Sequence, residues 1–334
     1  MKIVDFTPAH IPSAHSLALT CYQEERRYVP ELPATQDVPN LPEFAQNGMG
    51  VAALEGERLL GFLCGTAPFE QAFGSTDCTG VFSPMGAHGA VPEGRERIYG
   101  AMYQRAAEKW VRAGAVSHGI CLYAHDEAAN RQFFRYGFGM RCVDSVRLVE
   151  PVGGLPVKPI DALIDAPIDA RPVVGYRFFE LLPSECGRAY PLEVLLNRHC
   201  QSSPFFMNRQ LPDCDTFCKT CVREQERCFV AQWQGEDKLC AYLKLSHSGE
   251  TFISAAPDYR HITGAFCLEE HRGKGVYQNL LNYVIGVLKT ENVRYLGVDF
   301  ESINPAAHAF WSKYFSAYTH GVVRRIDERI LSVI

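Results

Sequence analysis

The chain has 334 residues, of which 47% are hydrophobic and 21% charged, with a formal net charge of −5. This composition is typical of a globular protein, and a mildly acidic chain without a basic tract is a poor partner for nucleic acid or an anionic membrane. We find no apolar run of membrane-spanning length and no apolar leader at the N-terminus, so we expect a cytoplasmic protein.

A segment rich in proline, glycine and aspartate interrupts the chain at residues 151–173. Such a composition is typical of a linker or strap between domains, and the length corresponds to about two domains of ordinary size. The sequence therefore predicts one domain at 1–150, a linker at 151–173 and a second domain at 174–334.

A group of cysteines follows at Cys214, Cys218, Cys221 and Cys228, among thirteen in the chain. The spacing of the first three is the one with which radical S-adenosylmethionine enzymes hold an iron–sulfur cluster. The four positions also fall on one face of a helix, and an amphipathic helix that packs on a sheet would use them as buried, reduced thiols. We favour the helix and expect no metal.

The next predicted elements are a strand at Ile262–Leu268, a turn that contains Arg272, Gly273, Lys274 and Gly275, and an amphipathic helix directly after it. Glycines let a backbone approach an anion closely, and the N–H groups at a helix N-terminus bind phosphates. The spacing matches neither a nucleoside-triphosphate P-loop nor a dinucleotide G-x-G-x-x-G motif. The turn is thus a candidate pyrophosphate site, or it is a glycine turn that only begins a helix.

A second strand and helix are predicted within residues 295–315. Apolar and polar residues alternate from Leu296 to Glu301, which indicates a strand. Asn304 and Pro305 then form a helix start, with asparagine as the N-cap and proline at the first helical position. The side-chain oxygen of Asn304 suffices for the cap, so its amide stays available as a hydrogen-bond donor.

Together, these two blocks resemble the GNAT acetyltransferases. Arg272-x-x-Gly275-x-Tyr277 is similar to the family's coenzyme A loop, R/Q-x-x-G-x-G/A, from which Tyr277 departs at the last position. Asn304 and the helix with Phe310 are also similar to the family pattern, although Trp311 stands where tyrosine is usual. The resemblance implies acetyl-coenzyme A (acetyl-CoA) as co-substrate. The residues that we expect to bind it are Phe266, Cys267, Leu268, Arg272, Gly273, Lys274, Gly275, Val276, Tyr277, Asn304 and Trp311.

The resemblance also implies a direct reaction, in which a neutral amine attacks the thioester and the backbone N–H of Phe266, Cys267 or Leu268 stabilises the oxyanion. Asp299 and Glu301 share one face of their strand and are candidate bases, unless each forms an ion pair with an arginine. Because the indole of Trp311 cannot supply a proton, Tyr314 is the candidate acid, or the thiolate leaves unassisted. The acceptor is expected to be a small-molecule or peptide amine that the sequence does not identify.

The first half of the chain repeats the pattern of the second. The same sequence distance separates Phe133 from Phe310 and Phe138 from Phe315, and weaker matches extend upstream with small drifts in this distance. Such regularity indicates a duplicated domain. We therefore expect a fold of the α/β (α+β) class with two GNAT-fold domains, each a central mixed, mostly antiparallel sheet flanked by helices.

The two copies differ in their coenzyme motifs. The alignment places Arg97 opposite Gly275 and Glu127 opposite Asn304. A side chain at the glycine position would crowd a bound anion, and a carboxylate supplies an acceptor where a donor is needed. The N-terminal copy is therefore expected to be degenerate, with the fold kept and ordinary coenzyme binding lost.

The sequence thus leads to an acetyl-CoA-dependent N-acetyltransferase in which the C-terminal domain is catalytic. One alternative is a non-catalytic coenzyme A-binding or scaffolding protein, because Trp311 replaces the customary tyrosine. A second alternative is a metal or iron–sulfur protein that uses Cys214, Cys218 and Cys221.

Overall fold

The computed structural model describes residues 1–35, 38, 41–74, 77–149, 173–207, 210–236 and 238–333. It divides into two compact units. The first unit comprises Met1–Asp144, Phe300–Ser302 and Ala317–Ile334, and the second comprises Ser145–Asp299 and Ile303–Ser316. Almost all of the expected linker, residues 151–172, lies outside the described residues. No helix in the described part of the chain is long and apolar enough to span a bilayer.

The first unit contains helices and strands from both ends of the chain. In chain order they are β1 (Lys2–Asp5), α1 (Ile11–Tyr28), α2 (Leu41–Gln46), β2 (Val51–Glu55), β3 (Arg58–Leu63), β4 (Gly80–Ser83), β5 (His88–Ala90), α3 (Arg95–Arg112), β6 (Ser117–Tyr123), α4 (Glu127–Arg135), β7 (Gly139–Leu148) and β13 (Ser316–Arg325). Strand β7 leaves this unit after Asp144, and β13 enters it at Ala317.

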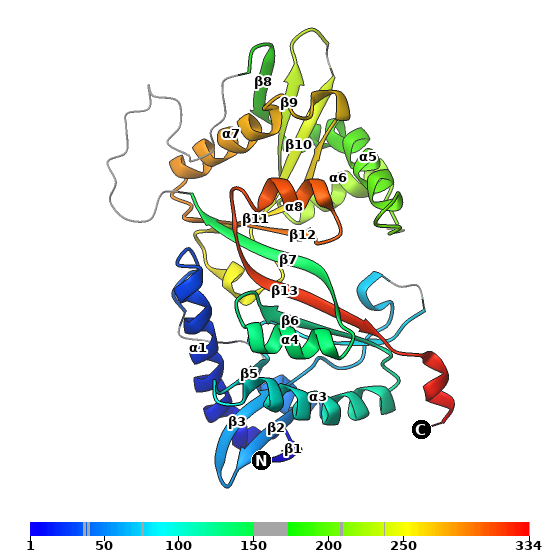
Figure 1. The fold of residues 1–334 in the computed structure, drawn as a ribbon. Coiled ribbons are helices and arrows are strands. Elements are labelled where there is room, and N and C mark those ends of the chain that lie inside the picture. Colours follow the sequence, from blue (N-terminus) through cyan, green and yellow to red (C-terminus); the bar gives the residue numbers. More distant parts are fainter. Residues whose placement is uncertain are drawn as a thin grey trace. The chain divides into compact units, whose positions relative to one another are not determined.

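Two sets of strands form the sheets of the first unit. Strands β1, β2, β3 and β5 are antiparallel in that order, with Ala53 of β2 between Ile3 of β1 and Gly61 of β3. Strand β6 pairs in parallel with β4 and antiparallel with β13, where Thr319 lies opposite Tyr123 (Figure 1). A strand from the C-terminal end of the chain thus completes the sheet of the first unit.

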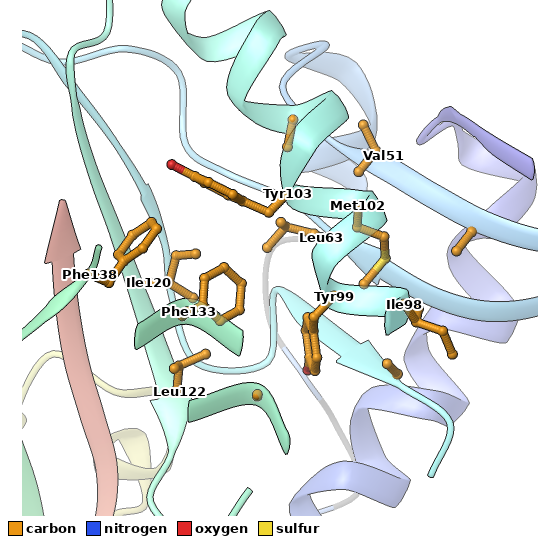
Figure 2. Close-up of a cluster of buried hydrophobic side chains, with 14 of the residues drawn as sticks. Val51, Leu63, Ile98, Tyr99, Met102, Tyr103, Ile120, Leu122, Phe133 and Phe138 are labelled. Carbon is orange, nitrogen blue, oxygen red and sulfur yellow. The ribbon is translucent and has the colours of Figure 1, made fainter. Parts of the chain in front are cut away.

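The core of the first unit gathers around α3. Its buried residues Ile98, Met102, Ala106 and Trp110 recur at the helical spacing that produces one apolar face. Figure 2 shows side chains of α3, including Tyr103, packed with the rings of Phe133 and Phe138, which come after β6 in the sequence. The Tyr103 and Phe133 rings meet edge to face at 5.7 Å, as do Phe133 and Phe138 at 5.3 Å. This packing holds α3 and α4 around one aromatic cluster.

The second unit is built on one sheet with the strand order β8-β9-β10-β11-β12. Its pairs are antiparallel except for the parallel pair β11–β12, so the expectation of a mixed, mostly antiparallel sheet flanked by helices is confirmed. The elements are β8 (Tyr176–Glu180), α5 (Tyr190–Gln201), α6 (Cys214–Arg223), β9 (Arg227–Trp233), β10 (Leu239–Ser246), β11 (Tyr259–Cys267), α7 (Val276–Thr290), β12 (Tyr295–Glu301) and α8 (Pro305–Trp311).

The helix starts of the two units correct the sequence alignment of the repeat. Helix α3 begins after Gly94 and α7 after Gly275, and both glycines have left-handed backbones, with φ of 70° and 82°. Helix α4 is capped by Asp126 as α8 is capped by Asn304. The counterparts of Gly275 and Asn304 are therefore Gly94 and Asp126. The pairings with Arg97 and Glu127 were wrong, because loop lengths shift the register between the halves.

Candidate functional site

The N-terminus of α7 and the loop before it form the centre of the candidate site. Gly273 and Gly275 have φ of 70° and 82°, a conformation in which a Cβ would be strained. The N–H of Asn279 bonds to the carbonyl of Gly275 at 3.1 Å, and the N–H groups of the preceding turn have no acceptor within the helix. Together with the helix dipole, these donors make the loop suitable for a phosphate group.

The side chain of Arg272 is fixed against the end of β11. Its Nε donates to the carbonyl of Cys267 at 2.9 Å, and its guanidinium lies 5.3 Å from the ring centroid of Phe266. A guanidinium held by a hydrogen bond and a ring loses less conformational freedom when it binds an anion. Lys274 is exposed, as Arg272 is.

Strands β11 and β12 separate as they approach this loop. The parallel pairing joins only Tyr259–Ile262 of β11 to Tyr295–Val298 of β12. The register of β11 against β10 shifts after Ile262. The shift is a bulge at Thr263, which bends the strand. Residues 264–267 then pair with β10 alone, so alternate backbone groups of β11 face the space that β12 has left.

The alternation identifies which backbone groups are available. The N–H of Leu268 donates to the carbonyl of Cys240 at 2.9 Å, so this donor is occupied. In an antiparallel ladder, Phe266 has the same orientation as Leu268, whereas Ala265 and Cys267 point away from β10. Of the three expected oxyanion donors Phe266, Cys267 and Leu268, only the N–H of Cys267 faces the open side.

A cavity of about 260 Å³ lies along these elements. It is lined by Leu196, His199, Ala265, Phe266, Cys267, His271, Arg272, Gly273, Val276, Tyr277, Gln278, Asn304, Ala306, Ala307, Phe310 and Trp311. Eight of the eleven expected coenzyme-binding residues are in this set. Leu268, Lys274 and Gly275 are not, although each adjoins a lining residue.

Asn304 begins α8 in the way that the sequence predicts. Its Oδ1 accepts the N–H of Ala307 at 3.0 Å, and Pro305 is the first helical residue. Asn304 also hydrogen-bonds the side chain of His199 on α5, which places an amide and an imidazole together in the cavity.

His199 and His271 are the functional groups of the cavity that sequence reasoning missed. The pKa of His199 lies below the usual imidazole range because of burial and the charge of Arg272, so this ring is neutral at neutral pH and can accept a proton. The Nδ1 of His271 hydrogen-bonds the hydroxyl of Tyr176 at 2.8 Å. His199 is distant in sequence from the glycine loop motif, and His271 lies beside the motif but outside its consensus. No local pattern therefore marks either residue.

The aromatic side of the cavity is a packed cluster. Tyr277 contacts Phe310 and Trp311 edge to face at 5.2 and 6.0 Å, and Trp311 is only 4% exposed. The hydroxyl of Tyr277 donates to the carbonyl of Tyr242 at 3.3 Å, and burial holds its pKa far above the usual range. Tyr277 therefore stays protonated and serves as packing and as a fixed donor.

None of the three expected catalytic side chains lines the cavity. Asp299 pairs with the Nε2 of His261 at 2.8 Å, and Tyr314 packs on Phe310 at 5.0 Å. Glu301 belongs to the first unit, where its carboxylate lies 3.7 Å from Arg141. This is the kind of ion pair that the sequence left open for these carboxylates.

The cysteine group is divided between a helix and a strand. Cys214, Cys218 and Cys221 lie on α6, as expected, but the helix ends at Arg223 and Cys228 lies on β9, so its place on the same helical face was wrong. Burial raises the pKa of Cys221 to about 12, which keeps it a neutral thiol. Among the described residues, no set of three or more histidine, cysteine or acidic side chains is arranged to hold a metal.

Comparison with known proteins identifies the second unit. A model of the acetyltransferase (GNAT) family matches residues 195–316, the segment that contains the cavity, the glycine loop and Asn304. Residues 195–316 are thus a GNAT domain. No curated protein sequence matches the chain.

Solved structures extend the GNAT fold over the whole chain. A GCN5-related N-acetyltransferase from Sphaerobacter thermophilus has a TM-score of 0.58 and 13% identity, over 97% of this chain and 95% of that one. The glucosamine N-acetyltransferase region of a fungal multi-domain GH3 β-N-acetylglucosaminidase has a TM-score of 0.50 and 13% identity, over 96% of this chain and 38% of that one. At this identity the likeness shows the fold alone, and it extends over both units.

Proposed function

We propose that the second unit of this GNAT protein binds acetyl-CoA and transfers its acetyl group to an amine. The observation that carries the proposal is the continuous cavity between the start of α7, the separated strand β11 and Asn304. It combines donors for a pyrophosphate, open strand backbone for an amide-bearing arm, and no lining carboxylate among the described residues that would repel the anion.

Each part of the coenzyme has a suitable group. The pyrophosphate binds the first N–H groups of α7 and the guanidinium of Arg272, and the pantetheine arm bonds to Ala265 and to the amide of Asn304. The thioester carbonyl then lies beside the N–H of Cys267, which stabilises the oxyanion as charge develops on it.

The chemistry requires a neutral amine nitrogen. It attacks the thioester carbon to form the C–N bond, and the tetrahedral intermediate collapses as the C–S bond breaks. The released coenzyme thiolate takes up the proton that the attacking nitrogen loses. We assign deprotonation of the ammonium to His199, which lines the cavity as a neutral imidazole, with Asp299 paired to His261 as the competing candidate. The thiolate is a stable enough anion to leave without an acid, so Tyr314 is not required.

Cys267 does not carry the acetyl group in this proposal. Its thiol is 8% exposed and donates to the carbonyl of Leu268 at 3.6 Å, and burial raises its pKa to about 12. Because the thiolate is the nucleophilic form, a thiol of this kind is a poor acyl acceptor. The amine therefore attacks acetyl-CoA directly.

Calorimetric titration with acetyl-CoA, followed by measurement of thiol release over a panel of amines, tests the proposal. We expect binding at one site and thiol release with at least one amine. Binding without any turnover would favour the alternative of a non-catalytic coenzyme A-binding protein, for which the buried Trp311 in the customary tyrosine position is the supporting observation. Failure to bind acetyl-CoA would reject both.

A further inference from the structure

The first unit has its own cavity, of about 450 Å³, at the place that corresponds to the coenzyme cleft of the second unit. Helix α1, the start of α3, the end of β6 and the start of α4 line it. In the second unit the matching elements are α5 and the starts of α7 and α8. The duplicated fold has therefore kept a cleft in both units.

The charges of the two clefts are opposite. The cavity in the first unit is lined by four carboxylates, against two arginines and one histidine: Glu24, Glu25, Asp126, Glu127, Arg27, Arg95 and His125. Among the described residues that line the second cleft, the titratable side chains are those of His199, His271, Arg272, Cys267 and Tyr277, and none is a carboxylate. Excess negative charge at the first cleft disfavours a diphosphate and favours a cation.

Arg95 closes the anion site that α3 would otherwise present. It is the first residue of that helix, and its guanidinium pairs with Glu24 at 2.7 Å and with Asp126 at 3.3 Å. Asp126 also accepts the N–H of Ala129 as the cap of α4. The guanidinium at the start of α3 is thus already paired with protein carboxylates.

Two buried polar groups of this cavity have no hydrogen-bond partner among the described residues. They are the hydroxyl of Tyr123, a residue only 4% exposed, and the Nε of Arg95. Leaving a buried donor unpaired costs free energy, so such groups are rare unless a ligand or water satisfies them. A ligand oxygen that accepts hydrogen bonds from Tyr123 and Arg95 would remove this cost.

The mouth of the cavity carries an aromatic platform. The carboxylate of Glu25, 2% exposed, accepts hydrogen bonds from the ring and the backbone N–H of His125 at 2.7 and 3.2 Å. The ring of His125 stacks on Tyr28 with centroids 4.8 Å apart and planes 2° apart, and Tyr28 is 65% exposed. An exposed tyrosine ring beside carboxylates attracts organic cations.

We propose that this cavity binds a small organic amine that also carries a hydroxyl group. Its ammonium lies against Glu24 and the ring of Tyr28, and its hydroxyl oxygen accepts from Tyr123. The site lies within the first unit and is independent of the acetyl-CoA cleft.

Calorimetric titration of the full-length protein with three related probes tests this. Tyramine has both groups, tyrosol replaces the amine by a hydroxyl, and phenethylamine lacks the phenolic hydroxyl. We expect tyramine to bind more tightly than either analogue, with about a tenfold gap to tyrosol because a charge-assisted contact is lost. Equal affinity for tyrosol, or no binding of tyramine to the native protein, overturns the proposal.

Tyr123→Phe locates the site. The substitution deletes a hydroxyl that has no partner, so the free protein is expected to keep or raise its melting temperature. It should weaken tyramine by about fivefold to tenfold and leave phenethylamine unchanged. His199→Gln, in the other cleft, is the control and should leave tyramine affinity unchanged. Unchanged tyramine binding in Tyr123→Phe, or its loss in His199→Gln, would place the amine elsewhere and reject the site.

Discussion

Gly94 and Gly275 occupy the same position in the two units, each with a left-handed backbone directly before the first residue of a long helix. Neither position tolerates a Cβ without strain, yet the two helix starts face different surroundings. At the first, Arg95 is paired with two carboxylates, whereas the second opens on a cavity with Arg272. Comparing Gly94 with Gly275 therefore distinguishes a glycine that the fold needs for its backbone conformation from a glycine that anion binding needs as well.

Gly275→Val and Gly94→Val form a matched pair of substitutions. Each places a β-branched residue in a left-handed conformation and should destabilise the protein by about 1–3 kcal/mol, measured by chemical denaturation. Only Gly275→Val should also reduce acetyl-CoA affinity, by at least about tenfold, because its side chain and the altered loop displace the pyrophosphate. Similar coenzyme affinities in the two variants would contradict the assignment of the cleft.

Asn304→Asp separates the capping role of Asn304 from its donor role. Aspartate caps helices as well as asparagine does, as Asp126 does for α4, so the stability of α8 should be kept. The carboxylate removes the amide donor and adds a negative charge beside the coenzyme. We expect the Kd for acetyl-CoA to rise by about tenfold with little change in melting temperature. An unaltered Kd would show that the amide does not contact the coenzyme.

Local sequence was sufficient where the predicted site coincides with a helix start. The glycine loop and the Asn304–Pro305 start depend on backbone conformation within a few residues, and both lie where the sequence predicts them. His199 could not be found in this way, because α5 reaches Asn304 only through the tertiary fold. Arg97 was aligned with Gly275 for a related reason, since a sequence offset carries no information about where a helix begins.

The carboxylates show a second limit of sequence reasoning. Alternation correctly placed Asp299 and Glu301 on one strand, but it does not reveal what each faces. Asp299 hydrogen-bonds His261, and Glu301 lies in an ion pair with Arg141. The alternation within the strand does not indicate either partner, because both are distant in the sequence. The membership of β13 in the first unit likewise depends on long-range pairing with β6 and has no local signal.

The buried imidazole of His118 should make the folded protein less stable in acid. It is fully buried between the hydroxyl of Tyr103 at 2.9 Å and the carbonyl of Ala115 at 3.1 Å, and burial lowers its pKa to about 4. Since the unfolded chain has an imidazole pKa of about 6.5, it binds the proton more readily than the folded chain between these two values. Stability is complete above about pH 6.5 and decreases by about 3 kcal/mol as the pH falls to the folded value.

Urea denaturation at a series of pH values measures this effect. His118→Phe loses two hydrogen bonds and is expected to be less stable at neutral pH, but its free energy of unfolding should depend less on pH between about 6.5 and 4. A slope equal to that of the native protein would assign the acid sensitivity to other groups.

The pH dependence of catalysis distinguishes His199 from Asp299 as the base. Burial and the charge of Arg272 lower the pKa of His199, so the reactive neutral form persists below the usual imidazole range, and kcat/KM should fall only as the pH drops through that lowered pKa. His199→Gln should reduce kcat/KM by about 10²–10⁴-fold and abolish this acid limb.

Asp299→Asn is the control, because Asp299 lies outside the cavity lining and bonds to His261. It should keep the limb at the native position. Because neutral asparagine cannot act as a base, loss of the limb in Asp299→Asn but not in His199→Gln would transfer the role to the carboxylate, and acetyl-CoA affinity measured in both variants would exclude a defect in coenzyme binding as the cause.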